Sequence, residues 1–446
     1  MKKKYRVYST PKDGKIDEYF KEVDKFTLVY PSKPELLIND FLKDVNKLSY
    51  EFKEEYSAKD IPKIWDKAGK ECIKLCEENL DVLSATTKFP EEALRLYVKN
   101  IFDNLKEDYL LKIVKGEIGN LEYLDKFAPS IVGYAKAYGP KYAVHIFPET
   151  IGPQPLSTFQ TGVIKTPAIC KPSSGEPIFT TLWIDSLKEV DENIGKYIWS
   201  VPWKGGNEKI EDKLFGNEDS AIIVYGDNIT IDNVKSKSKG NVLEYPFKAG
   251  IEIIKINNSE EINEIATKLV KDISYMDQCA CFSPHVVYVI GSPSDSKKLC
   301  EKMAKELDNC PIKRKKIGVD EKSVISMLKY TYLLEKSAGL DVEVYSGKDS
   351  LIIYEEDPSF QLSPLFRTIR VKPIKNIGEL VDLLYGYKNY LQTIGTNLKE
   401  KEKIADFFED YGISRVVDIG KMPINKLHHH EGRPLILPLI RWVDVE

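Results

Sequence analysis

Two cysteines, Cys279 and Cys281, lie in residues 273–291, ISYMDQCACFSPHVVYVIG, between a helix-like segment and a run of apolar, β-branched residues. A thiol reacts as the thiolate, so it needs a lowered pKa, partial exposure and N–H donors for a developing oxyanion. A junction between a helix and a strand offers such donors, and Pro284 fixes the turn after Cys281. Cys281 is therefore a candidate nucleophile. The alternative is a small core residue, the commonest fate of a free cysteine.

A histidine base for such a thiol is hard to find. The chain has five histidines, His145, His285 and the run His428 to His430. A cysteine–histidine hydrolase would need one of them beside the sulfur. His285 follows Cys281 by four residues, but it begins a predicted strand and need not face the thiol. The run at the C-terminal end is predicted to be a loop and not a metal site.

Length and composition exclude several classes of protein for this chain. The 446 residues are too many for one core, so two or three domains are expected. Because the net charge is −4, a basic surface for general nucleic-acid binding is not expected. Seven scattered cysteines argue against a disulfide framework and for a reducing, cytoplasmic location, and Cys72 and Cys76, without a second pair, predict no metal site. Neither a signal peptide nor a membrane span is expected, because no suitable apolar run occurs.

The spacing of apolar residues divides the chain into regions. Residues 1–32 carry short extended runs and predict a β-rich start, whereas residues 34–111 show three- and four-residue steps typical of amphipathic helices. From Lys141 onward, strand-like runs alternate with helical ones. This alternation predicts a parallel sheet covered on both faces, and a second α/β unit begins at the cysteines.

Two turns and one lysine follow strands of the first α/β unit. The turns are Trp203-Lys204-Gly205-Gly206 and Tyr225-Gly226-Asp227-Asn228, and Lys171 closes the strand PAICK. Parallel sheets bind ligands outside the carboxyl ends of their strands, where such turns can contact phosphates. Neither turn is a dinucleotide fingerprint or a P-loop, so ordinary turns and a surface lysine remain the alternatives.

Residues 278–289, QCACFSPHVVYV, resemble the active-site stretch of LuxC-type acyl-CoA reductases, the fatty acid reductases of the aldehyde dehydrogenase superfamily. The resemblance runs from about residue 85 to the end, over several segments in the family's order. These segments are WKGGNE (203–208), VYGDNITI (224–231), YPFKAGIEII (245–254), LSPLFRTIRVKPI (362–374), LQTIG (391–395), ISRVVDIGKM (413–422) and RWVDVE (441–446).

The resemblance implies an α/β, aldehyde dehydrogenase-like fold with two parallel-sheet domains, a bridging and oligomerisation arm and a helical N-terminal region. The expected parts are residues 1–140 (β-start and helices), 141–276 (cofactor domain), 277–400 (catalytic domain) and 401–446 (C-terminal return and arm). A homodimer or tetramer built through the arm is implied as well.

The implied activity is NADPH-dependent reduction of a fatty acyl thioester, acyl-CoA or acyl-protein, to the aldehyde. Cys281 aligns with the nucleophile because the family places that residue before x-Ser-Pro, and Cys279 aligns with a variable position. No metal is needed. An acyl-protein synthetase is the implied partner protein.

The resemblance also assigns the cofactor residues. Lys171 aligns with the superfamily lysine that contacts the adenosine ribose. Ser174 falls where NAD-preferring members often carry an acidic residue, so its neutral side chain favours NADPH over NADH. Gly226 and Asn228 fall in the turn that faces the cofactor phosphates, and three residues, Trp203, Gly205 and Gly206, lie one strand earlier on the same edge.

The chain departs from the superfamily pattern in three places. The Glu-Leu-Gly-Gly motif, whose Glu activates water, is replaced by residues 245–250, YPFKAG, which fits transfer to a thiol. The Gly-Asn-Val-Pro motif, whose Asn completes the oxyanion hole, is replaced by residues 149–153, ETIGP, where Thr150 is a weak substitute. The His-Asp-Gly motif becomes residues 430–432, HEG. The second oxyanion donor is therefore left unidentified.

Two alternative functions remain open. One is a CoA-acylating short-chain aldehyde dehydrogenase that uses NAD. The other is a non-reducing acyl-transfer partner of an acyl-protein synthetase, which the missing Asn favours.

Overall fold

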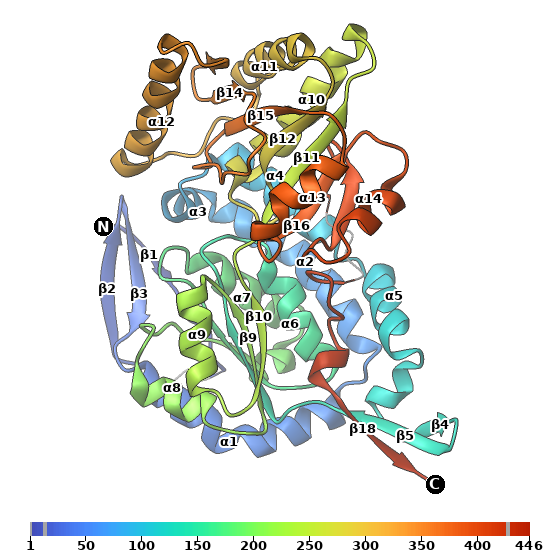
Figure 1. Ribbon diagram of the computed structural model, residues 1–446. Coiled ribbons are helices and arrows are strands. Elements are labelled where there is room, and N and C mark those ends of the chain that lie inside the picture. Colours follow the sequence, from blue (N-terminus) through green and yellow to red (C-terminus); the bar gives the residue numbers. More distant parts are fainter. Residues whose placement is uncertain (1, 12–15, 425–428) are drawn as a thin grey trace. The chain divides into compact units, whose positions relative to one another are not determined.

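The computed structural model describes residues 2–11, 16–424 and 429–446 (Figure 1). The chain forms two compact units. The first comprises Met1–Thr87, Leu94–Pro246 and Pro434–Glu446, and the second comprises Lys88–Ala93 and Phe247–Arg433. In the described parts of the chain, no helix is both long and apolar enough to cross a membrane.

The first unit begins with strands and continues with helices, which confirms both predictions for this region. The strands β1 (Lys3–Arg6), β2 (Glu18–Val23) and β3 (Phe26–Pro31) form one small sheet, with β3 in the middle. Helix α1 buries Leu37, Phe41, Val45 and Leu48 along one side, as its apolar spacing predicts. The helices are α1 (Pro34–Glu55), α2 (Asp60–Glu78), α3 (Leu80–Thr87), α4 (Glu91–Asp103) and α5 (Glu107–Ile118).

A five-stranded parallel sheet forms the core of the first unit. Its strands are β6 (Tyr142–Ile146), β7 (Ala168–Lys171), β8 (Ile198–Ser200), β9 (Ser220–Tyr225) and β10 (Asn241–Tyr245), in the order β10-β9-β6-β7-β8. Its connecting helices are α6 (Pro153–Val163), α7 (Ile178–Val190), α8 (Glu208–Phe215) and α9 (Asn228–Lys237). Right-handed crossovers place α6 and α7 on one face and α8 and α9 on the other. The strand order reverses between β6 and β9, and open sheets bind ligands at such a switch point.

A separate three-stranded sheet joins distant parts of the first unit. It consists of β4 (Ala128–Ser130), β5 (Gly133–Tyr138) and β18 (Arg441–Val445), with antiparallel pairing on both sides of β5 (Figure 1). The carboxylate of Glu117 accepts hydrogen bonds from the backbone of Leu435 and Ile436 at 2.7 Å. The role of this sheet in oligomerisation stays a prediction.

The second unit contains a seven-stranded sheet in the order β13-β14-β15-β12-β11-β16-β17. All neighbouring strands are parallel except the edge strand β13, which pairs with β14 in the antiparallel direction. The strands are β11 (Ala249–Lys255), β12 (Pro284–Ile290), β13 (Val342–Ser346), β14 (Leu351–Glu355), β15 (Thr368–Ile374), β16 (Leu391–Thr396) and β17 (Arg415–Asp418).

Helices cover both faces of this sheet. Along β11, Ile251 and Ile253 face α13 (Gly378–Leu384) and α14 (Lys401–Phe407), while Ile254 faces α10 (Ile262–Ser274) and α11 (Pro293–Asp308). Each fully buried aliphatic side chain of this kind contributes about 1.5–3 kcal/mol. The central strands therefore form a rigid support for the loops at their ends.

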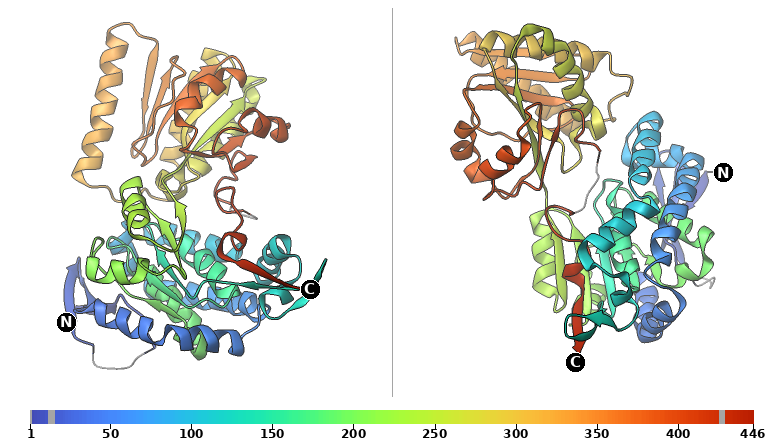
Figure 2. Two further views of the ribbon diagram at one scale, coloured as in Figure 1. Left: turned by 60° about the horizontal axis from the view of Figure 1, so that its bottom comes forward. Right: turned by 90° about the vertical axis from the view of Figure 1, so that its right-hand side faces the viewer.

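Helix α12 (Val319–Ser337) stands against β13 and β14 at one end of the sheet (Figure 2). In the described part of the chain there are also six short 3-10 segments, at Leu121–Leu124, Glu192–Lys196, Ser259–Glu261, Tyr275–Gln278, Tyr385–Tyr387 and Leu437–Leu439. The division into four parts at residues 140, 276 and 400 stays a prediction. In the structure, β11 and α10 already belong to the second unit.

Candidate active site

Cys281 lies half-buried in the short loop that leads into β12, the central strand of the second unit. The loop follows the segment Tyr275–Gln278, in which Met276, Asp277 and Gln278 have φ angles of 49°, 48° and 67°. Left-handed backbone costs an ordinary residue roughly 1–2 kcal/mol. Three such residues in a row therefore need strong contacts to hold them, and strain of this kind gathers at functional sites.

The contacts that hold this segment come from another left-handed segment. Leu365, Phe366 and Arg367 have φ angles of 69°, 55° and 63°. Arg367 Nε donates to Asp277 Oδ1 at 2.6 Å, and the backbone N–H of Phe366 donates to the carbonyl of Asp277 at 3.0 Å. The two strained segments thus stabilise one another.

Gly250 brings β11 close to the loop that carries Cys281. Its N–H donates to the Ser283 carbonyl at 2.8 Å, and a Cβ at this position would lie 2.3 Å from the Phe282 carbonyl oxygen. Both neighbours of β11 carry an irregularity beside Gly250. Between Gly250 and Glu252 the register with β12 shifts by one residue, and between Ala249 and Gly250 the register with β16 shifts in the same way.

The electrostatics of the site keep Cys281 as a thiol. Burial raises the pKa of Cys281 to about 12, and Glu431 acts in the same direction. Three groups oppose them and lower the pKa: the Gln392 side chain, the backbone N–H of Cys281 itself and the charge of Arg415. The Nε2 atom of Gln392 lies 3.6 Å from the Cys281 sulfur. These surroundings therefore favour the thiol over the thiolate at neutral pH.

Glu431 is a second ionisable group in this region. Burial raises its pKa to about 7, against the opposing charges of Lys248 and Arg433. A carboxyl group with this pKa changes its charge near neutral pH. Its ionisation will therefore affect the nearby thiol.

Cys279 occupies a different position from Cys281. Its sulfur lies 3.8 Å from the Asp277 carbonyl oxygen, within the same loop. The structure therefore puts Cys281, and not Cys279, beside the side chain of Gln392.

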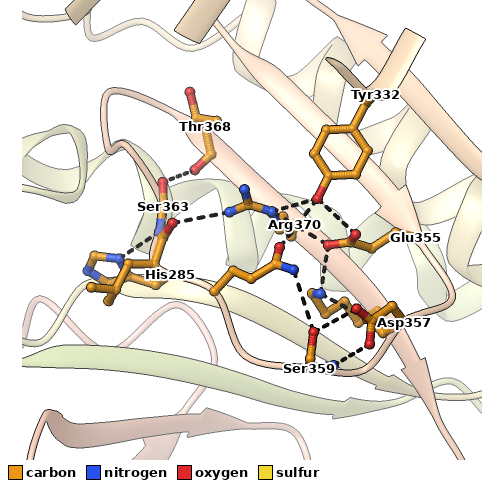
Figure 3. A network of polar contacts seen from close by, with 11 residues as sticks. His285, Tyr332, Glu355, Asp357, Ser359, Ser363, Thr368 and Arg370 are labelled. Atoms are coloured by element: carbon orange, nitrogen blue, oxygen red, sulfur yellow. Dashed lines mark hydrogen bonds and ion pairs between the residues drawn. The ribbon is translucent and has the colours of Figure 1, made fainter. Parts of the chain in front are cut away.

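His285 does not serve the thiol as a base. Its Nδ1 accepts a hydrogen bond from the Ser363 backbone N–H at 3.1 Å, and burial lowers its pKa to about 4. Figure 3 shows His285 at one end of a polar network on β12, β14 and β15. At the other end, Glu355 lies 2.6 Å from Lys372 Nζ and accepts from the Tyr332 hydroxyl at 2.8 Å. We interpret the network from His285 to Glu355 as structural.

The predicted cofactor residues gather at one edge of the sheet in the first unit. Lys171 ends β7, and the other residues follow β7, β8 or β9 at the carboxyl end of each strand. These residues are Ser174, Trp203, Gly205, Gly206, Gly226 and Asn228. Three of the strands are therefore represented on the edge where open α/β sheets bind nucleotides.

The residues at this edge fit a nucleotide in chemical character. Lys171 Nζ lies 5.6 Å from the centre of the Trp203 ring, and burial lowers the pKa of this lysine. Within the described ranges, the buried Nε1 of Trp203 has no hydrogen-bond partner. Added Cβ atoms at Gly205 and Gly206 would meet nothing within 4 Å. A cation, a spare N–H donor and open backbone suit a ribose and phosphates.

The turn after β9 is built as a helix start. Asp227 Oδ1 accepts from the Thr230 backbone N–H at 2.7 Å and caps α9, whose first residue is Asn228.

The remaining predicted residues lie in different places. Ser174 is exposed after β7. Thr150 lies after β6, in the first unit, and its part in an oxyanion hole stays a prediction. His428, part of the histidine run, lies outside the described residues.

Sequence reasoning missed Gln392, Glu431 and the pair Asp277–Arg367. Gln392 lies in LQTIG, one of the segments that carry the resemblance. Nothing in the spacing of this segment predicts that the Gln392 side chain faces the interior. The partners in the ion pair are 90 residues apart. The segment 430–432, HEG, was the one signal that could have pointed to Glu431.

Known proteins resemble this chain in sequence and in structure. Residues 58–443 match the family model described as acyl-CoA reductase (LuxC). The long-chain acyl-protein thioester reductase 2 of Photobacterium leiognathi is 24% identical over 348 residues, which cover 76% of this chain and 70% of that protein. The long-chain acyl-protein thioester reductase of Aliivibrio fischeri is 25% identical over 350 residues, with the same coverage, 76% and 70%.

Solved structures show the fold. Aldehyde dehydrogenase 21 from Physcomitrella patens has a TM-score of 0.75 at 12% identity, over 99% of this chain and 98% of that one. An NADP-dependent glyceraldehyde-3-phosphate dehydrogenase from Bacillus halodurans, complexed with NADP, has a TM-score of 0.73 at 13% identity, over 96% and 95% of the two chains. The expected fold is confirmed. This chain has the aldehyde dehydrogenase fold and belongs to the LuxC family of acyl-CoA reductases.

Proposed function

We propose that this protein reduces a long-chain fatty acyl thioester to the aldehyde with NADPH, through an acyl group carried on Cys281. The family match over residues 58–443 supports an oxidoreductase that acts on acyl groups. The observation that carries the assignment of the nucleophile is the position of Cys281, half-buried at the amino end of β12 and 3.6 Å from a side-chain amide.

The first half of the reaction is acyl transfer. The Cys281 sulfur attacks the thioester carbonyl carbon and forms a C–S bond, while the carbonyl electron pair moves to oxygen. When the tetrahedral species collapses, the bond to the carrier thiol breaks and the carrier leaves as a thiol, taking up the proton that Cys281 lost. The backbone N–H of Cys281 lies beside its own sulfur, so it can donate to the oxyanion.

The second half of the reaction is reductive. A bound nicotinamide nucleotide would supply the hydride for the acyl carbon. Lys171, Trp203 and the turn at Gly226 would hold the nucleotide. The resulting thiohemiacetal takes up a proton, the C–S bond breaks, and Cys281 returns as a thiol when the aldehyde leaves.

The missing water-activating Glu supports reduction over hydrolysis. In its place the chain carries residues 245–250, YPFKAG, where β10 ends and β11 begins. Without that motif's Glu, the acyl-cysteine lacks the residue that activates water in the hydrolytic members and can wait for hydride. Release of a free fatty acid is therefore expected to be slow.

The acyl donor is proposed from the relatives. The proteins named above are acyl-protein thioester reductases, whereas the family description names acyl-CoA. We infer that an acyl-protein synthetase delivers the acyl group in the cell and that acyl-CoA can replace it. The neutral Ser174 leaves room for a 2′-phosphate and supports NADPH over NADH.

Acyl labelling tests this function. Purified protein is mixed with radiolabelled hexadecanoyl-CoA, and then NADPH or NADH is added. The wild type is expected to take up about one acyl group and to release it as aldehyde with NADPH. Cys281→Ser should lose both, while Cys279→Ser should keep both. Labelling that survives Cys281→Ser but not Cys279→Ser would assign the nucleophile to Cys279. Labelling of the wild type without reduction would support the acyl-transfer alternative.

A further inference from the structure

We propose that the side-chain amide of Gln392 is the second oxyanion donor of the acylation and reduction steps. This inference rests on the proposed function and names a catalytic residue for it. Gln392 lies at the start of β16 and is 7% exposed. Its Nε2 atom lies 3.6 Å from the Cys281 sulfur, so it touches the reacting atom.

An extra residue in β16 aims Gln392 at the sulfur. The register pairs Ala249 with Leu391 and Gly250 with Thr393, so Gln392 is left without an opposite residue on β11. Side chains normally alternate along a strand. Leu391 and Ile394 nevertheless join the same apolar cluster, although they are three residues apart. A bulge explains this spacing, and bulges next to active sites re-aim a side chain.

Neighbouring contacts fix both the backbone and the amide. The Ser414 backbone N–H donates to the Gln392 carbonyl at 2.8 Å and anchors this part of the bulge. The Thr393 hydroxyl donates to Gln392 Oε1 at 3.3 Å. With the carbonyl end of the amide engaged, the NH₂ end is presented to the sulfur. The donor is therefore positioned before any substrate binds.

The geometry suits an oxyanion better than it suits the resting thiol. Sulfur is a weak acceptor, and 3.6 Å is a long contact. When the sulfur bonds to the carbonyl carbon, the negative oxygen is two bonds from sulfur and can enter the space beside the amide. There it accepts from Gln392 Nε2 on one side and from the Cys281 backbone N–H on the other. The same pair of donors serves the oxyanion that hydride addition creates.

A pair of reactions at Cys281 tests the proposal. Acylation by hexadecanoyl-CoA passes through an oxyanion, whereas alkylation by iodoacetamide does not. In Gln392→Met, which keeps the chain length without a donor, acylation should slow roughly 100- to 1000-fold, the range found when one oxyanion donor is removed. Alkylation should change by less than about tenfold, the scale of one ordinary hydrogen bond.

Two further variants complete the experiment. Gln392→Glu replaces the donor by an acceptor and should acylate as slowly as Gln392→Met, which provides a second reading if the methionine variant folds poorly. Gln361→Met, a glutamine substitution elsewhere in the second unit, is the matched control and should acylate like the wild type. Near-ultraviolet circular dichroism checks that each variant is folded.

The outcomes separate this inference from the proposed function. Equal slowing of acylation and alkylation would show that Gln392 acts only on the thiol pKa, and it would overturn the inference. Acylation at the wild-type rate in both Gln392 variants would overturn it too, with the proposed function intact. A wild-type protein that takes up no acyl group from the thioester would overturn both.

Discussion

The guanidinium of Arg367 and the carboxylate of Asp277 form a buried ion pair at 2.6 Å, with side-chain exposures of 3% and 1%. Both residues have positive φ angles, 63° for Arg367 and 48° for Asp277. The pair therefore ties together two backbone segments that are each unfavourable alone. One of these segments leads directly into the loop that carries Cys281.

Loss of the Arg367 charge should destabilise the second unit strongly. In Arg367→Met, Asp277 remains buried without its cation, and breaking a buried pair in this way typically costs about 3–5 kcal/mol. Thermal and urea unfolding followed by circular dichroism measure the change. The double variant Arg367→Met, Asp277→Asn should recover part of the loss, because Asn carries no charge and tolerates left-handed backbone.

An exposed pair provides the control. Lys305 and Glu301 are 2.5 Å apart on the surface of α11. Lys305→Met should leave the unfolding temperature unchanged, since exposed pairs contribute little. Equal effects of the Lys305 and Arg367 variants would contradict the role given to the buried pair.

Removal of the Glu431 charge should make Cys281 more reactive above pH 7 only. Glu431 has a pKa raised to about 7, so it is mostly neutral below that pH and negative above it. Its negative charge raises the pKa of Cys281. In Glu431→Gln, alkylation by iodoacetamide should therefore be about three- to tenfold faster at pH 8–9, since one pKa unit changes the thiolate fraction tenfold.

The pH profile also has an internal check. Below pH 6 the Glu431→Gln and wild-type rates should converge, because the wild-type carboxyl group is then protonated. Glu402→Gln, on α14, is the control and should follow the wild type throughout. A constant ratio of rates from pH 5 to pH 9 would rule out a charge effect of Glu431. Arg415→Met should act in the opposite sense, since Arg415 lowers the thiol pKa.

A methyl group at position 250 should displace the loop that carries Cys281. In Gly250→Ala the new Cβ would lie 2.3 Å from the Phe282 carbonyl oxygen and 2.7 Å from Met422 Cε. Because a backbone carbonyl cannot turn aside like a flexible side chain, the loop has to move. Acylation of Cys281 should fall by at least about 100-fold, the effect of roughly 1 Å of misplacement.

Gly386→Ala is the matched control for this prediction, because an added methyl group at Gly386 meets nothing within 4 Å. Acylation by hexadecanoyl-CoA measures both variants. If Gly250→Ala acylates as fast as Gly386→Ala, the close approach of β11 to the loop has no part in activity.

An acidic residue at position 174 should turn the cofactor preference towards NADH. Ser174 is exposed just beyond Lys171, at the carboxyl end of β7. In Ser174→Asp, the carboxylate would repel a 2′-phosphate and could accept from the ribose hydroxyls of NADH. The ratio of kcat/KM for NADPH to that for NADH should fall at least about tenfold, which corresponds to about 1.4 kcal/mol.

Ser236→Asp, an exposed position on α9, should leave this ratio unchanged. If both substitutions lower the ratio equally, the effect is one of net charge and not of position 174. If neither does, Ser174 has no part in recognising the 2′-phosphate.

The regular parts of this fold could be predicted because their spacing is local. Alternating and apolar runs predict the strands of both large sheets except β16 (Leu391–Thr396), and the apolar steps of residues 34–111 predict helices such as α1. Strands β4 and β5 were not predicted. They are short and half-exposed, and β5 is paired by β18 from the far end of the chain, so a short window contains no signal for them.

The site was predictable only where it lies in one continuous stretch. Cys281 stands out through the residues on either side of it, and the predicted cofactor residues stand out because each ends or follows a strand. Gln392 and Arg367 come from distant parts of the chain, and their roles depend on a bulge and on left-handed backbone. Neither feature leaves a residue pattern, since no glycine stands at the bulge or among the six residues with left-handed backbone.

The bulge at Gln392 makes deletion and substitution at this position very different events. A substitution changes one side chain next to the sulfur and leaves the pairing of β16 with β11 in place. A deletion removes the bulge itself: Leu391 and Ile394 are then two residues apart, the spacing that puts both on one face of a regular strand, so the apolar cluster is kept. The cluster therefore does not need residue 392, and what the extra residue adds to this strand is the side chain beside the sulfur.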